Sequence, residues 1–195
     1  MPRKTAADFD QELLDLFDQY VHGGIDRRTF LDRASKFAVG GVTAAMLLDD
    51  LSPRFAEAQV VKPDDGRLKT ARVEYAAPRG SGTMRGYLAQ PASAAGKLPG
   101  VLVVHENRGL NPHIEDITRR LALENFLAFA PDALAPLGGY PGSEDEARAL
   151  FQKLDQAKTR ADMVAAAGYL QALPACTGKV GVVGFCWGGG IANYL

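Results

Sequence analysis

One short stretch near the end of the chain combines a reactive side chain with the small residues needed to expose it. Residues 184–190 read Gly-Phe-Cys-Trp-Gly-Gly-Gly, so Cys186 has a glycine two positions before it and another two positions after it. A nucleophile on a sharp strand-to-helix turn has strained backbone angles, and these two neighbours must be small because the chain passes close to itself. Gly184 and Gly188 meet that requirement. The spacing therefore predicts a nucleophile elbow with Cys186 at its tip.

A thiol in this place is suited to attack on a carbonyl group. The turn would hold the sulfur at the carboxyl edge of a sheet, where open α/β folds bind ligands, and beside a helix opening at 191–195. The positive end of a helix dipole favours the thiolate, which is the reactive form of cysteine. The alternative for a lone thiol is a buried, inert cysteine, but the glycines and the preceding apolar strand favour the elbow.

The chain before Cys186 has the element order of an α/β sheet. Segments with strand patterns lie at 71–75, 83–90, 101–104, 127–130 and 179–185. The first two predict an antiparallel pair at the sheet edge, whereas the last three are apolar throughout, as in parallel strands covered on both faces. We expect the strand at 101–104 to lie at the sheet centre. Right-handed crossovers between such strands give a three-layer α/β sandwich.

Helices are expected between the parallel strands. One begins near Pro112, because proline suits the first turn of a helix. The other begins at Ser143, whose hydroxyl forms a capping box with the carboxylate of Glu146. We expect it to be one long helix with an inner stripe of Leu150, Leu154, Ala157, Ala161 and Val164.

The elbow sequence resembles the dienelactone hydrolase family of α/β-hydrolases, in which cysteine stands in the place of serine. The resemblance covers residues 70–195 and includes the stretch from Val103 to Gly109, which reads Val-Val-His-Glu-Asn-Arg-Gly. It implies a hydrolase that opens a lactone or carboxylic ester through a thioester on Cys186, without a metal or other cofactor. A small-molecule ester or lactone is therefore the expected partner.

The same resemblance implies roles for three residues around the thiol. Glu106 would lie beside it, either accepting its proton or repelling premature thiolate formation. The backbone amides of Asn107 and Trp187 would form an oxyanion hole, in which the loss of one donor typically costs about 2.7–4 kcal/mol. The side chain of Trp187 is either a pocket wall or core packing.

The remaining histidines and the second cysteine have weaker claims to a role. His105 is expected to pack or hydrogen-bond near the site, His113 to face solvent at a loop or helix start, and Cys176 to be a structural thiol. No grouping of cysteine and histidine has zinc-ligand spacing.

The expected triad is incomplete. In α/β-hydrolases the acid and the histidine follow the nucleophile, but residues 187–195 contain no Asp, Glu or His. We therefore expect an α/β-hydrolase fold that is incomplete at its C-terminal side, from a truncated gene product, a recombinant fragment or one segment of a longer protein, with inactivity as one outcome. The alternatives are a non-catalytic remnant or small-molecule-binding fragment, and a thiol redox protein that uses Cys186 with Cys176.

Residues 1–58 differ in character from the expected hydrolase-like domain at 59–195. Apolar residues at three- and four-residue spacing predict an amphipathic helix over 5–22, which Gly23 and Gly24 can end. The sequence Arg-Arg-Thr-Phe-Leu at 27–31 then precedes an uncharged run at 37–48. With the small residues Ala56 and Ala58 as a cleavage site, this order predicts a twin-arginine export signal and a periplasmic or exported protein.

The alternative is a retained helical extension of a cytoplasmic protein. In that case residues 26–48 form a second helix, which is capped by Asp26 and packs against the first.

The composition narrows the class of partner. The 195 residues include 22 basic and 23 acidic ones, and this balance gives no indication of a nucleic acid or an anionic membrane. The 12-residue uncharged run at 37–48 is too short for a stable membrane span, which needs about 20 apolar residues. The sequence carries no signal for the oligomeric state.

Overall fold

The computed structural model describes residues 5–52 and 59–195 of the chain. The chain forms two compact units, residues 1–54 and residues 55–195. The expected cleavage site at Ala56 to Ala58 lies outside the described residues. Within those residues, none of the helices has the length and apolar content needed to cross a membrane.

The N-terminal unit is a group of short helices with an apolar core of its own. Its elements are η1 (Ala6–Asp8), α1 (Gln11–Val21), α2 (Arg27–Ala34), η2 (Ser35–Phe37) and α3 (Ala44–Leu51). The side chains of Asp10, Asp26 and Thr43 each accept a backbone N–H in the first turn of the following helix. The core consists of Leu13, Leu16, Tyr20, Phe30, Ala34, Leu47 and Leu48.

This unit matches the expected helical pair only in part. Asp26 caps α2, as the retained-extension alternative predicts. The expectation of one helix over 26–48 is wrong, because Gly40 and Gly41 have φ angles of 65° and 86°, which no right-handed helix contains. Phe30 of the basic motif is fully buried, and its ring centroid lies 5.3 Å from that of Tyr20.

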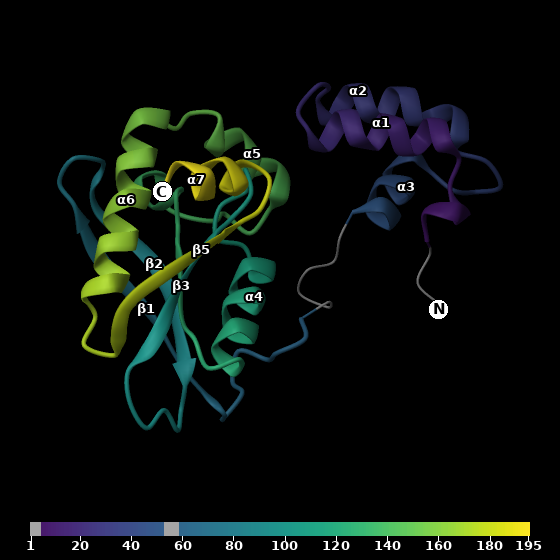
Figure 1. Ribbon diagram of the computed structural model, residues 1–195. Coiled ribbons are helices and arrows are strands. Elements are labelled where there is room, and N and C mark those ends of the chain that lie inside the picture. Colours follow the sequence, from purple (N-terminus) through teal and green to yellow (C-terminus); the bar gives the residue numbers. More distant parts are fainter. Residues whose placement is uncertain (1–4, 53–58) are drawn as a thin grey trace. The chain divides into compact units, whose positions relative to one another are not determined.

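The C-terminal unit is a five-stranded sheet with helices on both faces, as Figure 1 shows. The strands are β1 (Leu68–Ala77), β2 (Gly82–Pro91), β3 (Leu98–Val104), β4 (Leu127–Pro131) and β5 (Cys176–Gly184), in the order β1-β2-β4-β3-β5. β1 pairs antiparallel with β2, as expected, and β3 is parallel to both β4 and β5. The expectation that the strand at 101–104 lies at the sheet centre is wrong, because the middle strand is β4. The chain crosses from β3 to the side that faces β2, so β4 is inserted between β2 and β3.

The helices of this unit complete a three-layer α/β sandwich, as the element order predicts. They are α4 (Pro112–Leu123), α5 (Glu144–Phe151), α6 (Gln156–Ala172) and α7 (Trp187–Tyr194), with a short η3 turn (Ala135–Leu137). Alternate residues of β3 enter different cores. Leu102 belongs to the core cluster that includes Met163 of α6, whereas Val103 belongs to the cluster that includes Ile114 of α4.

The expected long helix after Ser143 is two helices. Asp155 accepts the backbone N–H groups of Ala157 and Lys158, so it ends the connection from α5 and starts α6. This break changes the helical phase, and Val164, expected on the inner stripe, is 48% exposed. The residues of α6 that are buried instead are Thr159, Asp162, Met163, Ala166 and Leu170.

Candidate active site

Cys186 lies at the tip of the turn between β5 and α7. Its backbone angles are φ 52° and ψ −113°, outside the regions that residues with a side chain normally occupy. Cys186 is an exposed residue. A Cβ atom added at Gly184 would lie 1.8 Å from the carbonyl oxygen of Gly188, and one at Gly188 would lie 2.4 Å from that of Val104. Both flanking positions therefore need glycine, as the elbow motif requires.

The strand register places the loop after β3 beside this turn. Val104 pairs with Gly184 on neighbouring parallel strands, and the N–H of Phe185 donates to the carbonyl oxygen of Val104 at 3.1 Å. Glu106 and Cys186 each follow this pair by two residues. The structure thus brings both to the carboxyl edge of the sheet, where open α/β folds bind ligands.

The amides expected in the oxyanion hole come from the same two segments. Trp187 is the first residue of α7, so its N–H is among those without a partner in the helical pattern. Asn107 is half-buried in the loop after β3. The indole ring of Trp187 stacks on His105, with centroids 5.6 Å apart, and meets Phe151 edge to face at 5.0 Å. The side chain of Trp187 is therefore packing for the elbow.

His105 is held as a neutral imidazole. It is fully buried, and the N–H of Ala133 donates to its Nε2 at 3.0 Å, so the proton is on Nδ1, which donates to the carbonyl oxygen of Glu106. Burial lowers its pKa, against the opposing charge of Asp132. Because both ring nitrogens are engaged, His105 fixes the loop that carries Glu106 and is not placed to move a proton at the thiol.

A polar cluster that the sequence did not reveal lies behind Glu106. The guanidinium of Arg108 has Nη1 at 3.9 Å from Glu106 Oε2 and Nε at 3.0 Å from Glu144 Oε2. Glu144 Oε1 accepts hydrogen bonds from Asn111 Nδ2 at 3.2 Å and from the hydroxyl of Tyr140 at 3.0 Å. Arg108 is within the stretch that resembles the family. No local sequence pattern links it to Tyr140 or Glu144, which lie more than 30 positions further along the chain.

The second thiol is far from the first. Cys176 is 2% exposed and begins β5, whereas Cys186 follows the end of that strand. Eight residue steps along β5 at about 3.3 Å each separate the two ends by about 26 Å, and a disulfide needs Cα atoms within about 7 Å. The geometry therefore excludes the alternative of a redox pair. His113 is the second residue of α4, as expected, and is half-buried.

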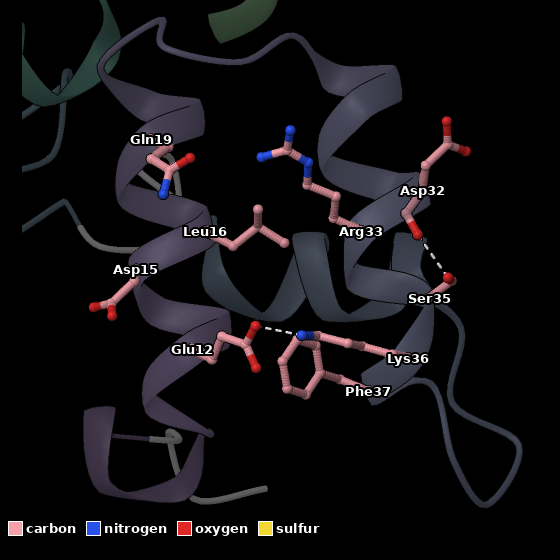
Figure 2. A pocket seen from close by; sticks show the side chains of 9 residues that line it. All are labelled: Glu12, Asp15, Leu16, Gln19, Asp32, Arg33, Ser35, Lys36 and Phe37. Atoms are coloured by element: carbon pink, nitrogen blue, oxygen red, sulfur yellow. Dashed lines mark hydrogen bonds and ion pairs between the residues drawn. The ribbon is translucent and has the colours of Figure 1, made fainter.

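A second site would need a metal-binding cluster or a further cavity. In the part of the chain that the structure describes, no group of three or more His, Cys, Asp or Glu side chains is arranged to hold a metal ion. A cavity of about 530 Å³ lies between α1 and the α2–η2 segment of the N-terminal unit. Figure 2 shows the ion pair of Lys36 with Glu12 between the two segments, and the hydroxyl of Ser35 bonded to the carbonyl oxygen of Asp32.

The sheet, its covering helices and the glycine-flanked turn define an α/β-hydrolase fold. The chain belongs to the dienelactone hydrolase family, because the model of that family matches residues 84–195. A second family model, described as YqhI-like, matches residues 1–39.

Among curated relatives, "Putative hydrolase fragment YghX" of Escherichia coli (strain K12) is 48% identical over 114 residues, which are 58% of this chain and 97% of that protein. A "Putative carboxymethylenebutenolidase" of Methylorubrum extorquens is 30% identical over 187 residues, 94% of this chain and 59% of that protein. The match to this second relative extends across both units.

Solved structures give the same assignment. The protein m3DLH has a TM-score of 0.54 and 31% identity, over 66% of this chain and 53% of that chain. The dienelactone hydrolase-like promiscuous phosphotriesterase P91 from metagenomic libraries has a TM-score of 0.53 and 30% identity, with the same coverage. The chain therefore spans about half the length of these solved relatives.

Proposed function

We propose that this chain carries the nucleophile and the oxyanion-binding part of a hydrolase that cleaves a lactone or carboxylic ester of a small molecule. The observation that carries the proposal is the exposed Cys186 on a strained turn, between two positions where only glycine fits. Strain of this kind costs about 1–3 kcal/mol and persists only where the surrounding structure enforces it. Membership of a hydrolase family supports the same conclusion.

The proposed reaction begins with attack of the Cys186 sulfur on the carbonyl carbon. A carbon–sulfur bond forms, the carbonyl oxygen takes the negative charge, and the N–H groups of Asn107 and Trp187 stabilise it. Collapse of this intermediate breaks the carbon–oxygen bond and leaves a thioester on Cys186. The released alkoxide takes a proton and becomes an alcohol, which stays attached to the acyl group when the substrate is a lactone.

Glu106 is proposed to control the proton of the thiol. Glu106 follows the end of the strand next to the one that leads to Cys186. A carboxylate near a thiol either raises the pKa of the thiol by its charge or accepts the thiol proton on attack. Release of the thioester needs water activated by a base. His105 is engaged at both nitrogens, so we expect acylation of this chain to be much faster than its hydrolytic turnover.

A single acylation experiment tests the proposal. The protein is mixed with p-nitrophenyl acetate, release of p-nitrophenolate is followed by absorbance, and the acyl group is located by intact mass. We expect about one equivalent released and one acetyl group bound, both lost in Cys186→Ala and both kept in the matched control Cys176→Ala. Equal acylation of wild type and Cys186→Ala, or none in either, would instead favour a non-catalytic remnant or binding fragment.

A further inference from the structure

The loop after β3 places one guanidinium between two carboxylates. Arg108 reaches Glu144 through Nε and faces Glu106 through Nη1, at 3.0 Å and 3.9 Å. The side chain of Arg108 is 16% exposed, and those of Glu106 and Glu144 are each 29% exposed. Charges that are half-buried are screened less by solvent and salt than surface charges. The guanidinium of Arg108 therefore attracts the carboxylates of both Glu106 and Glu144.

Glu144 is anchored on the side away from the elbow. The amide group of Asn111 and the hydroxyl of Tyr140 both donate to its Oε1. Asn111 is itself fully buried, and its side-chain oxygen caps α4 by accepting the N–H of Ile114. Burial raises the pKa of Glu144, whereas Tyr140, Arg108 and Asn111 act in the opposite direction. The carboxylate is thus fixed to the starts of two helices, α4 and α5.

We propose that Arg108 is a positioning residue, held by Glu144, that keeps the carboxylate of Glu106 directed at the thiol of Cys186. The inference rests on the proposed function, because it assigns a partner to the proton-controlling carboxylate of that site. The planar fork of arginine contacts two carboxylates through different nitrogens, whereas the single ammonium group of lysine acts as a point charge. Arg108 then acts on the thiol through Glu106.

The direction of each effect follows from the charges. A carboxylate beside a thiol raises the pKa of the thiol, so Glu106→Gln lowers it. The guanidinium holds that carboxylate toward the thiol, so Arg108→Met releases the carboxylate and also lowers the pKa of the thiol. Each change is expected to be about one pH unit, which corresponds to an about tenfold change in thiolate at a pH below the pKa.

The experiment is the pH dependence of alkylation of Cys186 by iodoacetamide in the 195-residue chain, with Cys176→Ala as background. It is independent of turnover, and it compares Glu106→Gln, Arg108→Met and Arg108→Lys. Arg148→Met is the matched control, because Arg148 is 11% exposed and pairs with Asp145 of α5 at 3.1 Å. We expect Glu106→Gln and Arg108→Met to lower the pKa of the thiol in the same direction, and Arg108→Lys to lower it less than Arg108→Met. Arg148→Met should leave it within about 0.3 units.

The double variant Glu106→Gln/Arg108→Met shows whether Arg108 acts through Glu106. In the Glu106→Gln background, Arg108→Met should then shift the pKa of the thiol by no more than Arg148→Met does. The proposal is overturned if Arg108→Met has its full effect in that background, if it has no effect in either, or if Glu106→Gln leaves the thiol unchanged. Acylation by p-nitrophenyl acetate can still succeed in each case, so these failures differ from failure of the proposed function. If Arg108→Met does not fold, Arg108→Lys carries the same comparison.

Discussion

A single methyl group at Gly184 tests how tight the elbow must be. The added Cβ of Gly184→Ala would lie 1.8 Å from the oxygen and 2.2 Å from the carbon of the Gly188 carbonyl group. A carbon and an oxygen that are not bonded normally stay about 3.3 Å apart, so the two sides of the turn must separate by about 1.5 Å. Both sides are backbone, so no side chain can rotate away to relieve the contact.

This displacement is expected to affect stability and chemistry together. Overpacking in well-packed sites typically costs about 1–3 kcal/mol, and we expect Gly184→Ala to lower the free energy of unfolding by about 3 kcal/mol. The amide of Trp187, which we propose to bind the oxyanion, lies within the displaced turn. Since a misplacement of about 1 Å can cost a factor of about 100 in rate, acylation of Cys186 should fall by about that factor.

Gly190→Ala, on the helix that follows the turn, is the matched control. An added Cβ at Gly190 would meet no atom within 4 Å, and alanine in a helix is favoured over glycine by about 0.5–1 kcal/mol. Guanidinium chloride unfolding should therefore show that Gly184→Ala is destabilised and that Gly190→Ala is as stable as wild type or more so. Acylation by p-nitrophenyl acetate should be slowed in Gly184→Ala alone of these two variants. If Gly184→Ala is as stable and as readily acylated as wild type, the tight turn is not what holds Cys186 in place.

Three further predictions concern other parts of the chain. Burial lowers the pKa of His105, so below pH 6.5 the unfolded chain binds a proton that the folded state resists. The free energy of unfolding should therefore fall below that pH, by up to about 1.4 kcal/mol per pH unit. Urea titrations should show that His105→Gln flattens this dependence on pH. Asp116→Ala removes the acceptor of the amides of Val60 and Val61. It also removes a negative charge 3.8 Å from the fully buried Arg119. We expect the free energy of unfolding to fall by about 3–5 kcal/mol, and an unchanged value would contradict the buried pairing. If the twin-arginine hypothesis holds, the chain followed by a reporter protein is exported and replacement of both arginines at 27 and 28 by lysine stops export, whereas unaltered export would refute the hypothesis.

Features with a local signal were predictable from the sequence. The strands, the start of α4 at Pro112 and the turn at Cys186 each depend on a few consecutive residues, namely apolar runs, a proline and two glycines. These signals do not need knowledge of which segments meet in space. The part of the site that lies on the elbow could therefore be placed before the fold was known.

Features set by the tertiary arrangement were not predictable in this way. The middle position of β4 follows from the direction of a crossover, which apolar runs do not encode. The break before α6 depended on Asp155, whose capping role competes with continuation of a helix across it. The contact between Asn111 and Glu144 joins residues 33 positions apart, and neither residue type has a spacing rule that would pair them.

The N-terminal unit shows how one motif can serve two interpretations. The side chain of Phe30, which follows the arginine pair, is packed between helices in a core that includes Leu13 and Leu47. A receptor that reads this residue would need it accessible, so recognition would require the helices to separate first. A retained helical unit needs no such opening, which makes the export test on this segment decisive for its role.

The two cysteines have opposite surroundings, since Cys186 is exposed and Cys176 is buried. Labelling of the two thiols can therefore report on two different events in the same chain. A maleimide dye attached to the open thiol would mark the mouth of the elbow without any engineering, because the other sulfur is shielded at the base of the same strand. That shielded sulfur becomes reactive only when the strand leaves the sheet, so its labelling rate measures unfolding. One protein sample can thus follow events at the site and loss of the fold separately, each from its own end of β5.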